Sequence, residues 1–299
     1  MKKLKLVLLI VANNDYQTEQ TIAAKQAAHE CDIELQVIET EHDAVTQSQE
    51  VFKLLYSPPE TRPDGILFEP VGTPIANAAK IAASSGIGWV VLNREVDYLG
   101  ELRRQCTAPL FSVTTDHDKV GQIQGEQIAA LLPHGGRVFY IQGPSDNKAA
   151  VQRAAAMQAA KPANVEVRAL KGLWTEESAY HAVSSWIKLN VTKEAHFGVV
   201  AAQNDAMVLG ARRAFQELTE GADRDHWLSL PYIGCDGLPN TGQAYVRRGI
   251  LAATIVIPAN AGQAIKTLVH ALRAGRQPPE CILVNSESYP EITKLKPKP

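Results

Sequence analysis

The sequence predicts an α/β protein of two lobes, each built on a doubly wound parallel sheet. The chain has 299 residues, which is more than one hydrophobic core usually serves, so two lobes of about 150 residues are expected. Short runs of Val, Ile and Leu alternate with segments of helical period, the pattern of βαβ units. Several runs are apolar throughout, as in strands that are covered on both faces of a sheet.

Ten apolar runs are expected to form strands, and ten strands fit two sheets better than one. They are residues 4–11, 33–38, 65–69, 88–93, 109–115, 137–142, 165–170, 197–202, 232–235 and 250–257. The first run follows two lysines, but it is short and leads into NNDYQTEQ without a small-residue cleavage pattern, so we interpret it as a strand and not as a secretory leader. None of the runs approaches the roughly 18 apolar residues of a membrane span.

Three of the intervening helices have clear limits. Asp116 is expected to cap a helix over 117–132. Apolar residues at helical spacing predict a second helix over 176–190 and a third over 259–274, which Gly275 ends.

Composition and motifs exclude several functions. The residues are 45% hydrophobic and 21% charged, with a net charge of −2, so neither nucleic acid nor an anionic membrane is an expected partner. The sequence has no GxGxxG after the first strand, no GxxxxGK[ST] loop and no GxSxG elbow. Its eight histidines lack metal-binding spacing, and its four cysteines, expected to be reduced and mostly buried, form no CxxC pair. We expect no cofactor, no metal and no catalytic residue.

Polar residues follow several of the expected strands. Ligands of open α/β sheets bind outside the carboxyl ends of the strands. The residues at these ends are Asn14 and Tyr16, Glu69, Asn93 and Arg94, Asn204 and Asp205, and Asp236. Amides, carboxylates and Arg suit the hydroxyls of a polyol, which both donate and accept. Asn and Asp also cap helices and form turns, Trp174 could cover a ligand or fill the core, and Tyr16 could stack on a ligand or make a hydrophobic contact.

AAQNDAMVLGARRAF (201–215) and IGCDGLPNTGQAYVRRGILAATI (233–255) resemble the ribose-binding-protein group of type I periplasmic solute-binding proteins. The resemblance runs from residue 4 to about residue 285, and the same fold forms the effector domain of lactose-repressor-type regulators. It implies two Rossmann-like lobes joined by a hinge of three crossings, with a sugar between them. We expect residues 1–115 and 258–284 in the N-terminal lobe, and residues 116–257 and 285–299 in the C-terminal lobe.

The resemblance also implies roles for individual residues. Asn14, Tyr16, Asn93 and Arg94 match pocket residues of the first lobe. Trp174 matches an aromatic residue that stacks on the sugar, and Asn204 and Asp236 match hydrogen-bonding residues of the second lobe. Asn204 should therefore point toward the ligand, while Asp205 caps the next helix and braces the loop.

Several positions depart from the family pattern. Glu69 stands where ribose binders have an amide, and Asn93 stands where they have an acid. Val151 replaces an Arg that reaches the sugar, although Arg153 is retained. The segment IVIPAN (255–260) lacks the Gln that closes the ribose site, and Gln17 replaces a second aromatic residue. These differences make ribose itself doubtful and leave other monosaccharides or similar small polar ligands open.

The leading interpretation is a solute-binding protein, not an enzyme, that closes over a carbohydrate-like ligand and delivers it to an ABC sugar transporter or a chemoreceptor. We expect a monomer without membrane insertion. It would be periplasmic or extracytoplasmic if an export signal has been trimmed, and cytoplasmic if the chain is complete as written. The alternatives are a cytoplasmic ligand sensor or regulator effector domain without a DNA-binding segment and, less favoured, an α/β enzyme using Glu69, Glu95 or Asp236.

Overall fold

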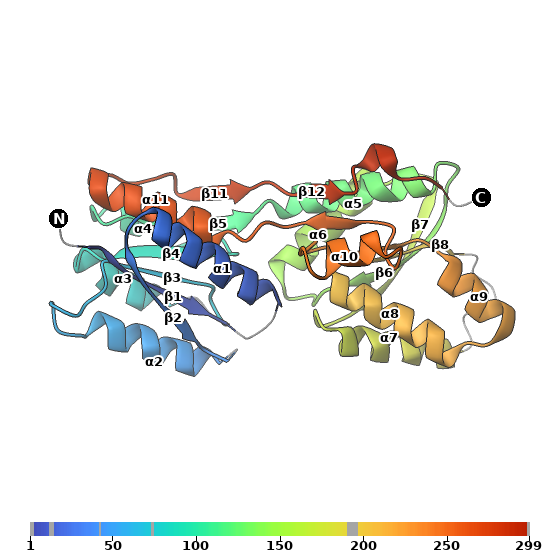
Figure 1. The fold of residues 1–299 in the computed structure, drawn as a ribbon, viewed down its shortest axis with the longest axis horizontal. Helices are drawn as coiled ribbons and strands as arrows, with labels where there is room; N and C mark the ends of the chain where they lie inside the picture. Colours follow the sequence, from blue (N-terminus) through green and yellow to red (C-terminus); the bar gives the residue numbers. More distant parts are fainter. Residues whose placement is uncertain (1–2, 12–14, 42, 73–74, 190–196, 298–299) are drawn as a thin grey trace. The chain divides into compact units, whose positions relative to one another are not determined.

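The computed structural model describes residues 3–11, 15–41, 43–72, 75–189 and 197–297 (Figure 1). The chain divides into two compact units. Unit 1 runs to Thr115 and includes Ala259–Val284, and unit 2 is formed by Asp116–Pro258 and the segment from Asn285 onward. Each unit is an α/β domain on a parallel sheet, so the predicted fold class is confirmed.

Unit 1 has a six-stranded parallel sheet in the order β11-β5-β4-β3-β1-β2. The strands are β1 (Lys5–Ile10), β2 (Glu34–Glu39), β3 (Gly65–Phe68), β4 (Gly88–Leu92), β5 (Leu110–Thr115) and β11 (Cys281–Val284). The helices are α1 (Asp15–Glu30), α2 (Ala44–Leu55), α3 (Ala76–Ser84), α4 (Leu99–Arg103) and α11 (Ala261–Ala274). The chain winds in opposite directions from β1, so the switch point of this sheet lies between β1 and β3, where open sheets place their ligands.

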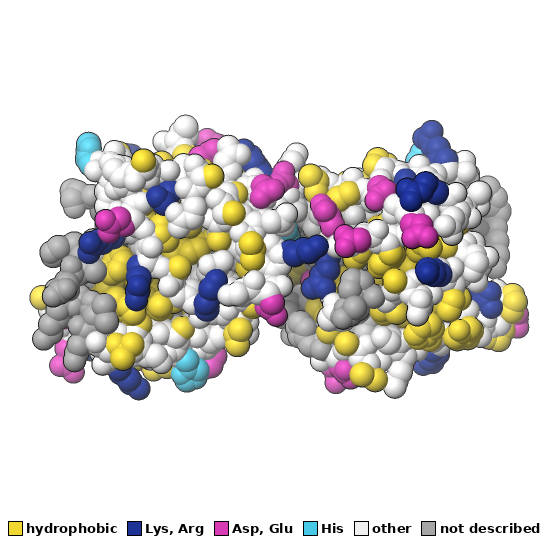
Figure 2. All heavy atoms as spheres, turned by 180° about the vertical axis from the view of Figure 1, so that it is seen from behind, with side chains coloured by type: hydrophobic (Ala, Val, Ile, Leu, Met, Phe, Trp, Pro, Cys, Tyr) yellow, Lys and Arg dark blue, Asp and Glu magenta, His cyan; other side chains and the backbone are white. Residues whose placement is uncertain are grey.

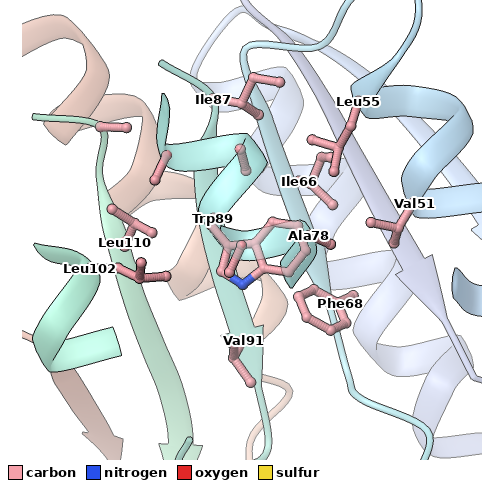
Figure 3. Close-up of a cluster of buried hydrophobic side chains, with 14 of the residues drawn as sticks. Val51, Leu55, Ile66, Phe68, Ala78, Ile87, Trp89, Val91, Leu102 and Leu110 are labelled. Atoms are coloured by element: carbon pink, nitrogen blue, oxygen red, sulfur yellow. The ribbon is translucent and has the colours of Figure 1, made fainter. Parts of the chain in front are cut away.

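Helices cover both faces of this sheet. On one face Trp89 and Phe68 meet edge to face, with ring centroids 4.7 Å apart, under side chains of α2 and α3 such as Val51 and Ala78 (Figure 3). On the other face α1 and α11 pack residues such as Ala24 and Leu268 against the strands. This double cover explains why β1, β3 and β4 are almost wholly apolar.

Unit 2 has a four-stranded parallel sheet in the order β7-β6-β8-β9, with its switch point between β6 and β8. The strands are β6 (Gly136–Gln142), β7 (Val165–Lys171), β8 (Phe197–Ala202) and β9 (Tyr232–Ile233), beside an antiparallel pair of β10 (Thr254–Val256) and β12 (Glu287–Tyr289). The helices are α5 (His117–Leu131), α6 (Lys148–Ala160), α7 (Glu176–Lys188), α8 (Asp205–Leu218), α9 (Gly221–Ser229), α10 (Gly242–Arg247) and the 3₁₀ turn η2 (Ile292–Lys294).

The core of unit 2 is rich in aromatic rings. Phe215 and Trp227 stack with centroids 3.9 Å apart and an interplanar angle of 5°, and Phe139 lies edge-on to both. These rings join α8 and α9 to the sheet face that α7 also covers. The opposite face packs against α5 and α6 through residues such as Ile128 and Met157.

Most predicted element limits are confirmed. Asp116 caps α5 by accepting a hydrogen bond from the backbone N–H of Lys119, at 2.9 Å. Gly275 ends α11 in the left-handed conformation, with φ of 63°. The expected strand over 250–257 shrinks to β10, because residues 250–252 are irregular and Ala253 makes only an isolated bridge to Ile233. Strands β11 and β12 were not predicted.

Two further expectations concern cysteines and surface charge. All four cysteines are free, but only Cys235 is buried, so the expectation of mostly buried thiols was wrong. Acidic and basic side chains are interspersed on the face shown in Figure 2. No helix among the described residues combines the length and the apolar character needed to cross a membrane.

Candidate functional site

Backbone strain marks three of the residues predicted to bind a ligand. Among the described non-glycine residues, five have positive φ, and three of these are Asn93 (59°), Trp174 (66°) and Asp236 (100°). Each lies in the connection that follows a strand. A bulky or acidic residue held at positive φ costs free energy that the surrounding fold must offset, and such residues concentrate at functional sites.

In unit 1, three of the predicted residues form one hydrogen-bonded network. Asn93 donates from Nδ2 to Oε2 of Glu69 at 2.9 Å, and its Oδ1 accepts from the hydroxyl of Tyr16 at 3.1 Å. Gln17 donates from Nε2 to the same Oε2 of Glu69 at 2.8 Å. Tyr16 and Gln17 lie at the start of α1, after β1, and Glu69 follows β3. The network therefore spans the switch point of the sheet.

Buried amides support this network from behind. Asn260, which is fully buried, donates from Nδ2 to Oδ1 of Asn93 at 2.6 Å and to the carbonyl of Val113 at 3.1 Å. Gln20 donates from Nε2 to Oδ1 of Asn260 at 3.0 Å and to the Tyr16 hydroxyl at 2.9 Å. On the other side, Gln47 donates from Nε2 to the carbonyl of Glu69 at 2.8 Å. These contacts fix the orientations of the Asn93, Tyr16 and Glu69 side chains.

The other two predicted residues of unit 1 lie outside this network. Arg94 donates from Nη1 to the carbonyl of Gly72 at 2.9 Å. Asn14 lies outside the described residues.

In unit 2, Arg153 lies beneath the predicted site. Its side chain is buried, with 7% exposure, and Nη1 donates to the carbonyl of Gln203 at 2.8 Å. Its Nε lies 3.3 Å from Nδ1 of His117, and burial together with the Arg153 charge lowers the pKa of His117 to about 3. His117 is therefore neutral at physiological pH and accepts this hydrogen bond.

Trp174 lies over the end of β6. A Cβ added to Gly143 would come within 2.4 Å of the indole ring, so only glycine fits beneath it. The guanidinium carbon of Arg153 lies 5.7 Å from the centre of the ring. The indole is half-buried and packs against the aromatic core, so it fills part of the core, and its contact with a ligand stays a prediction.

Asn204 has the helix-capping role that was expected of Asp205. Asn204, not Asp205, is the N-cap of α8, since its Oδ1 accepts from the backbone N–H of Met207 at 2.8 Å. Its Nδ2 donates to the carbonyl of Trp174 at 2.8 Å and so holds that strained residue in place. Asp205 does brace the loop, accepting from the N–H of Gly237 at 2.9 Å and the hydroxyl of Thr254 at 2.7 Å.

Two carboxyl groups lie close together in unit 2. Burial raises the pKa of Asp236 to about 7, against the opposing effect of Arg153. Burial and the neighbouring Asp236 raise the pKa of Asp205 well above its ordinary range. Burial also raises the pKa of the Cys235 thiol to about 12, so this cysteine is not a nucleophile at neutral pH. Near pH 7, Asp236 can thus either donate or accept a hydrogen bond.

The chemistry of both sets of residues is that of hydrogen bonding and aromatic contact. In the part of the chain that the structure describes, no cluster of His, Cys, Asp and Glu is arranged to hold a metal ion. A surface hollow of about 660 Å³ along α2, lined by Ala44, Val45, Ser48, Gln49 and Phe52, includes none of the candidate residues.

Several network residues were not predicted. Gln20, Gln47 and Asn260 in unit 1 and Gln203 in unit 2 are buried amides that hold the candidate residues. Gln203 directly follows the strand expected over 197–202, the same cue that identified Asn93, so it belongs with the strand-end residues. Asn260 lies three positions after the run over 250–257, so this cue does not single it out. Gln20 and Gln47 lie inside helices and give no such cue.

Known proteins similar to this chain fall in one group. Residues 6–277 match the family described as "Periplasmic binding protein domain". The ribose import binding protein RbsB of Escherichia coli is 30% identical over 183 residues, which cover 60% of this chain and 55% of RbsB. The D-galactose/methyl-galactoside binding periplasmic protein MglB of Haemophilus influenzae is 28% identical over 185 residues, or 57% and 53% of the two chains. The matches thus span about half the length of these curated relatives.

Solved structures share the fold over nearly the whole chain. A solute-binding protein of Actinobacillus succinogenes with bound D-allose has a TM-score of 0.79 at 20% identity, covering 96% of this chain and 97% of the other. One of Bacillus halodurans with bound myo-inositol has a TM-score of 0.77 at 19% identity, covering 96% and 94%. The expected kinship with type I periplasmic solute-binding proteins is confirmed, and this chain belongs to the periplasmic binding protein domain family.

Proposed function

We propose that this protein binds a small carbohydrate-like solute and closes over it without chemical conversion. The main support is that each unit carries rigidly held hydrogen-bonding side chains at the switch point of its sheet, with the strained Trp174 beside those of unit 2. Sugar hydroxyls need donors and acceptors together, and the C–H face of a sugar ring needs an aromatic surface.

The comparisons support the same class of ligand. The relatives named above are a ribose and a galactose binding protein, and the solved neighbours hold D-allose and myo-inositol. We further propose that the closed form is recognised by an ABC permease or a chemoreceptor outside the cytoplasm, and that the protein acts as a monomer.

A thermal-shift panel of pentoses, hexoses, deoxy sugars, polyols and amino acids tests the proposal. A ligand present at 100 times its Kd adds about 2.7 kcal/mol to the free energy of unfolding, which a melting curve detects. Trp174→Ala should abolish the shift that the best sugar produces. The control Tyr56→Ala, which removes an exposed ring at the C-terminal end of α2, should retain the thermal shift.

Two results would contradict the proposal. One is the absence of any stabilising sugar or polyol, and the other is turnover of a bound sugar by the wild-type protein. Small-angle scattering with and without the stabilising sugar tests closure, and we expect the radius of gyration to fall on binding.

A further inference from the structure

The hydrogen-bonding capacity of the Asn93 oxygen is fully used inside unit 1. Its Oδ1 accepts from both Tyr16 and Asn260, and a carbonyl oxygen has two lone pairs. Its Nδ2 already donates to Glu69. Asn93 therefore could accept a hydrogen bond from a ligand only by giving up one of these contacts.

Glu69 is oriented by the same network but keeps one oxygen available. Its Oε2 accepts from Gln17 and Asn93, whereas its Oε1 accepts no hydrogen bond from any described residue. The side chain is half-buried, so solvent and ligands can reach it. Within the described ranges no Lys, Arg or His forms an ion pair with Glu69. The guanidinium of Arg94, which follows Asn93, donates to the carbonyl of Gly72.

On the basis of the proposed function, we propose that Glu69 is the acceptor of unit 1 that meets the ligand and sets its chemical class, with Asn93 and Gln17 as positioning residues. An unneutralised carboxylate oxygen accepts from a hydroxyl or an ammonium group and repels an anion. The ligand class is therefore a neutral or amino-substituted sugar or polyol, and sugar acids and sugar phosphates are rejected.

Glu69→Gln tests this assignment with little change to the network. Its amide oxygen can still accept from Gln17 and Asn93, which turns an NH₂ group outward in place of the acceptor. We expect a ligand-free melting temperature close to that of the wild type and affinity for the stabilising sugar weakened about 10- to 100-fold, the range for loss of a charged hydrogen bond. Sugar acids that the wild type rejects should gain affinity relative to the neutral sugar.

The matched control is Glu39→Gln. Glu39 is exposed at the carboxyl end of β2, on the same edge of the same sheet, so this variant makes the same change in net charge. Its affinity for the sugar should equal that of the wild type. A loss equal to that of Glu69→Gln would mean that overall charge, and not contact, governs binding.

The positioning role of Asn93 calls for a double variant. Asn93→Asp places a second carboxylate next to Oε2 of Glu69, where 2.9 Å now separates donor and acceptor, and should lower the melting temperature. Adding Glu69→Gln restores a donor and acceptor pair with reversed polarity. This arrangement turns the amide oxygen of residue 69 outward, so the double variant should recover the melting temperature and bind the neutral sugar more tightly than Glu69→Gln alone.

The outcomes separate this inference from the proposed function. If the wild type binds a sugar and Glu69→Gln binds it equally well with unchanged preference, Glu69 is not the ligand acceptor. Recovery of the melting temperature in the double variant with an affinity no better than that of Glu69→Gln alone would also overturn the assignment, because an outward acceptor at residue 69 would then make no difference to binding. If the wild type binds no sugar or polyol, the proposed function fails and the inference fails with it.

Discussion

Each unit uses a glutamine to link the two strands at its switch point, but the two glutamines have different partners. In unit 1, Gln17 bonds to the side chain of Glu69. In unit 2, Gln203 accepts from the N–H of Gly143 at 2.8 Å and donates to the carbonyl of Ala150 at 2.8 Å, so both partners are backbone groups. A substitution at residue 69 can therefore change the hydrogen bond of Gln17. A substitution at Gly143 or Ala150 would retain the backbone groups that Gln203 binds.

The two sets of residues also differ in how they hold charge. Unit 1 has a single half-exposed carboxylate in an amide network. Unit 2 encloses Asp205 and Asp236 beside the buried Arg153, where desolvation dominates. This contrast suggests that unit 1 discriminates between ligands and that unit 2 supplies a rigid surface.

The largest effect is expected for Asp205→Ala in unit 2. Two buried donors, the N–H of Gly237 and the hydroxyl of Thr254, lose their acceptor, at a cost of about 1–3 kcal/mol each. Relief of a costly buried acid offsets part of this, so we expect a net loss of about 3 kcal/mol. Urea unfolding of the variant and of the exposed control Asp223→Ala measures it, and equal midpoints would refute the bracing role.

A smaller loss is expected for Asn260→Ala in unit 1. This change removes hydrogen bonds to Asn93 and Val113 and leaves Gln20 without one acceptor, for about 2 kcal/mol. It should also weaken sugar binding, because Asn93 loses its support. Calorimetric titration and urea unfolding measure both effects, with the exposed Asn240→Ala as control. A stability loss without a change in affinity would separate the buried amides from recognition.

The pH dependence of stability should distinguish the units further. The folded pKa of Asp236, about 7, lies above its ordinary value of 3.8, so folding binds a proton in this range. Its contribution to stability is complete below about pH 4 and is lost as the pH rises through about 7, at no more than about 1.4 kcal/mol per pH unit. Asp236→Asn should flatten this slope. Urea midpoints at pH 5 and pH 8 measure it, and an unchanged slope would place the titration elsewhere.

The smallest effect is expected away from both sets of residues. Arg213 bonds to Glu176 and Glu177 at the surface of unit 2, and its guanidinium lies 4.1 Å from the centre of the Tyr180 ring. Exposed ion pairs contribute little, so Arg213→Ala should lower the urea midpoint less than Asn260→Ala does and leave ligand binding unchanged. A loss above that of Asn260→Ala would mean that surface charge stabilises unit 2 more than its polar interior does.

Local patterns predicted the elements and the strand-end residues well. Apolar runs identified every strand of the two parallel sheets except β11, and a polar residue directly after such a run identified Glu69, Asn93 and Asp236. The same rule did not show which of two adjacent polar residues caps the following helix. Asn and Asp are almost equally good N-caps, so the sequence could not show that Asn204 rather than Asp205 caps α8.

Long-range partners could not be predicted in this way. Gln20 and Asn260 are 240 positions apart, and their hydrogen bond depends on how α1 and α11 pack on one face of the sheet. Similarly, no local pattern reveals that Asn93 accepts hydrogen bonds from the half-buried Tyr16 and the buried Asn260. The sequence therefore identified where polar groups gather, while the folded packing decides which of them remain available.

The interleaved connectivity of the two units has a consequence for synthesis on the ribosome. Strand β11 and helix α11, which covers one face of the sheet of unit 1, are translated only after Asp116–Pro258. At about 5–20 residues per second, the sheet waits on the order of 10–30 s for that cover while unit 2 emerges. During that interval only α1 covers this face of the sheet, so the part of the face that α11 later covers stays exposed.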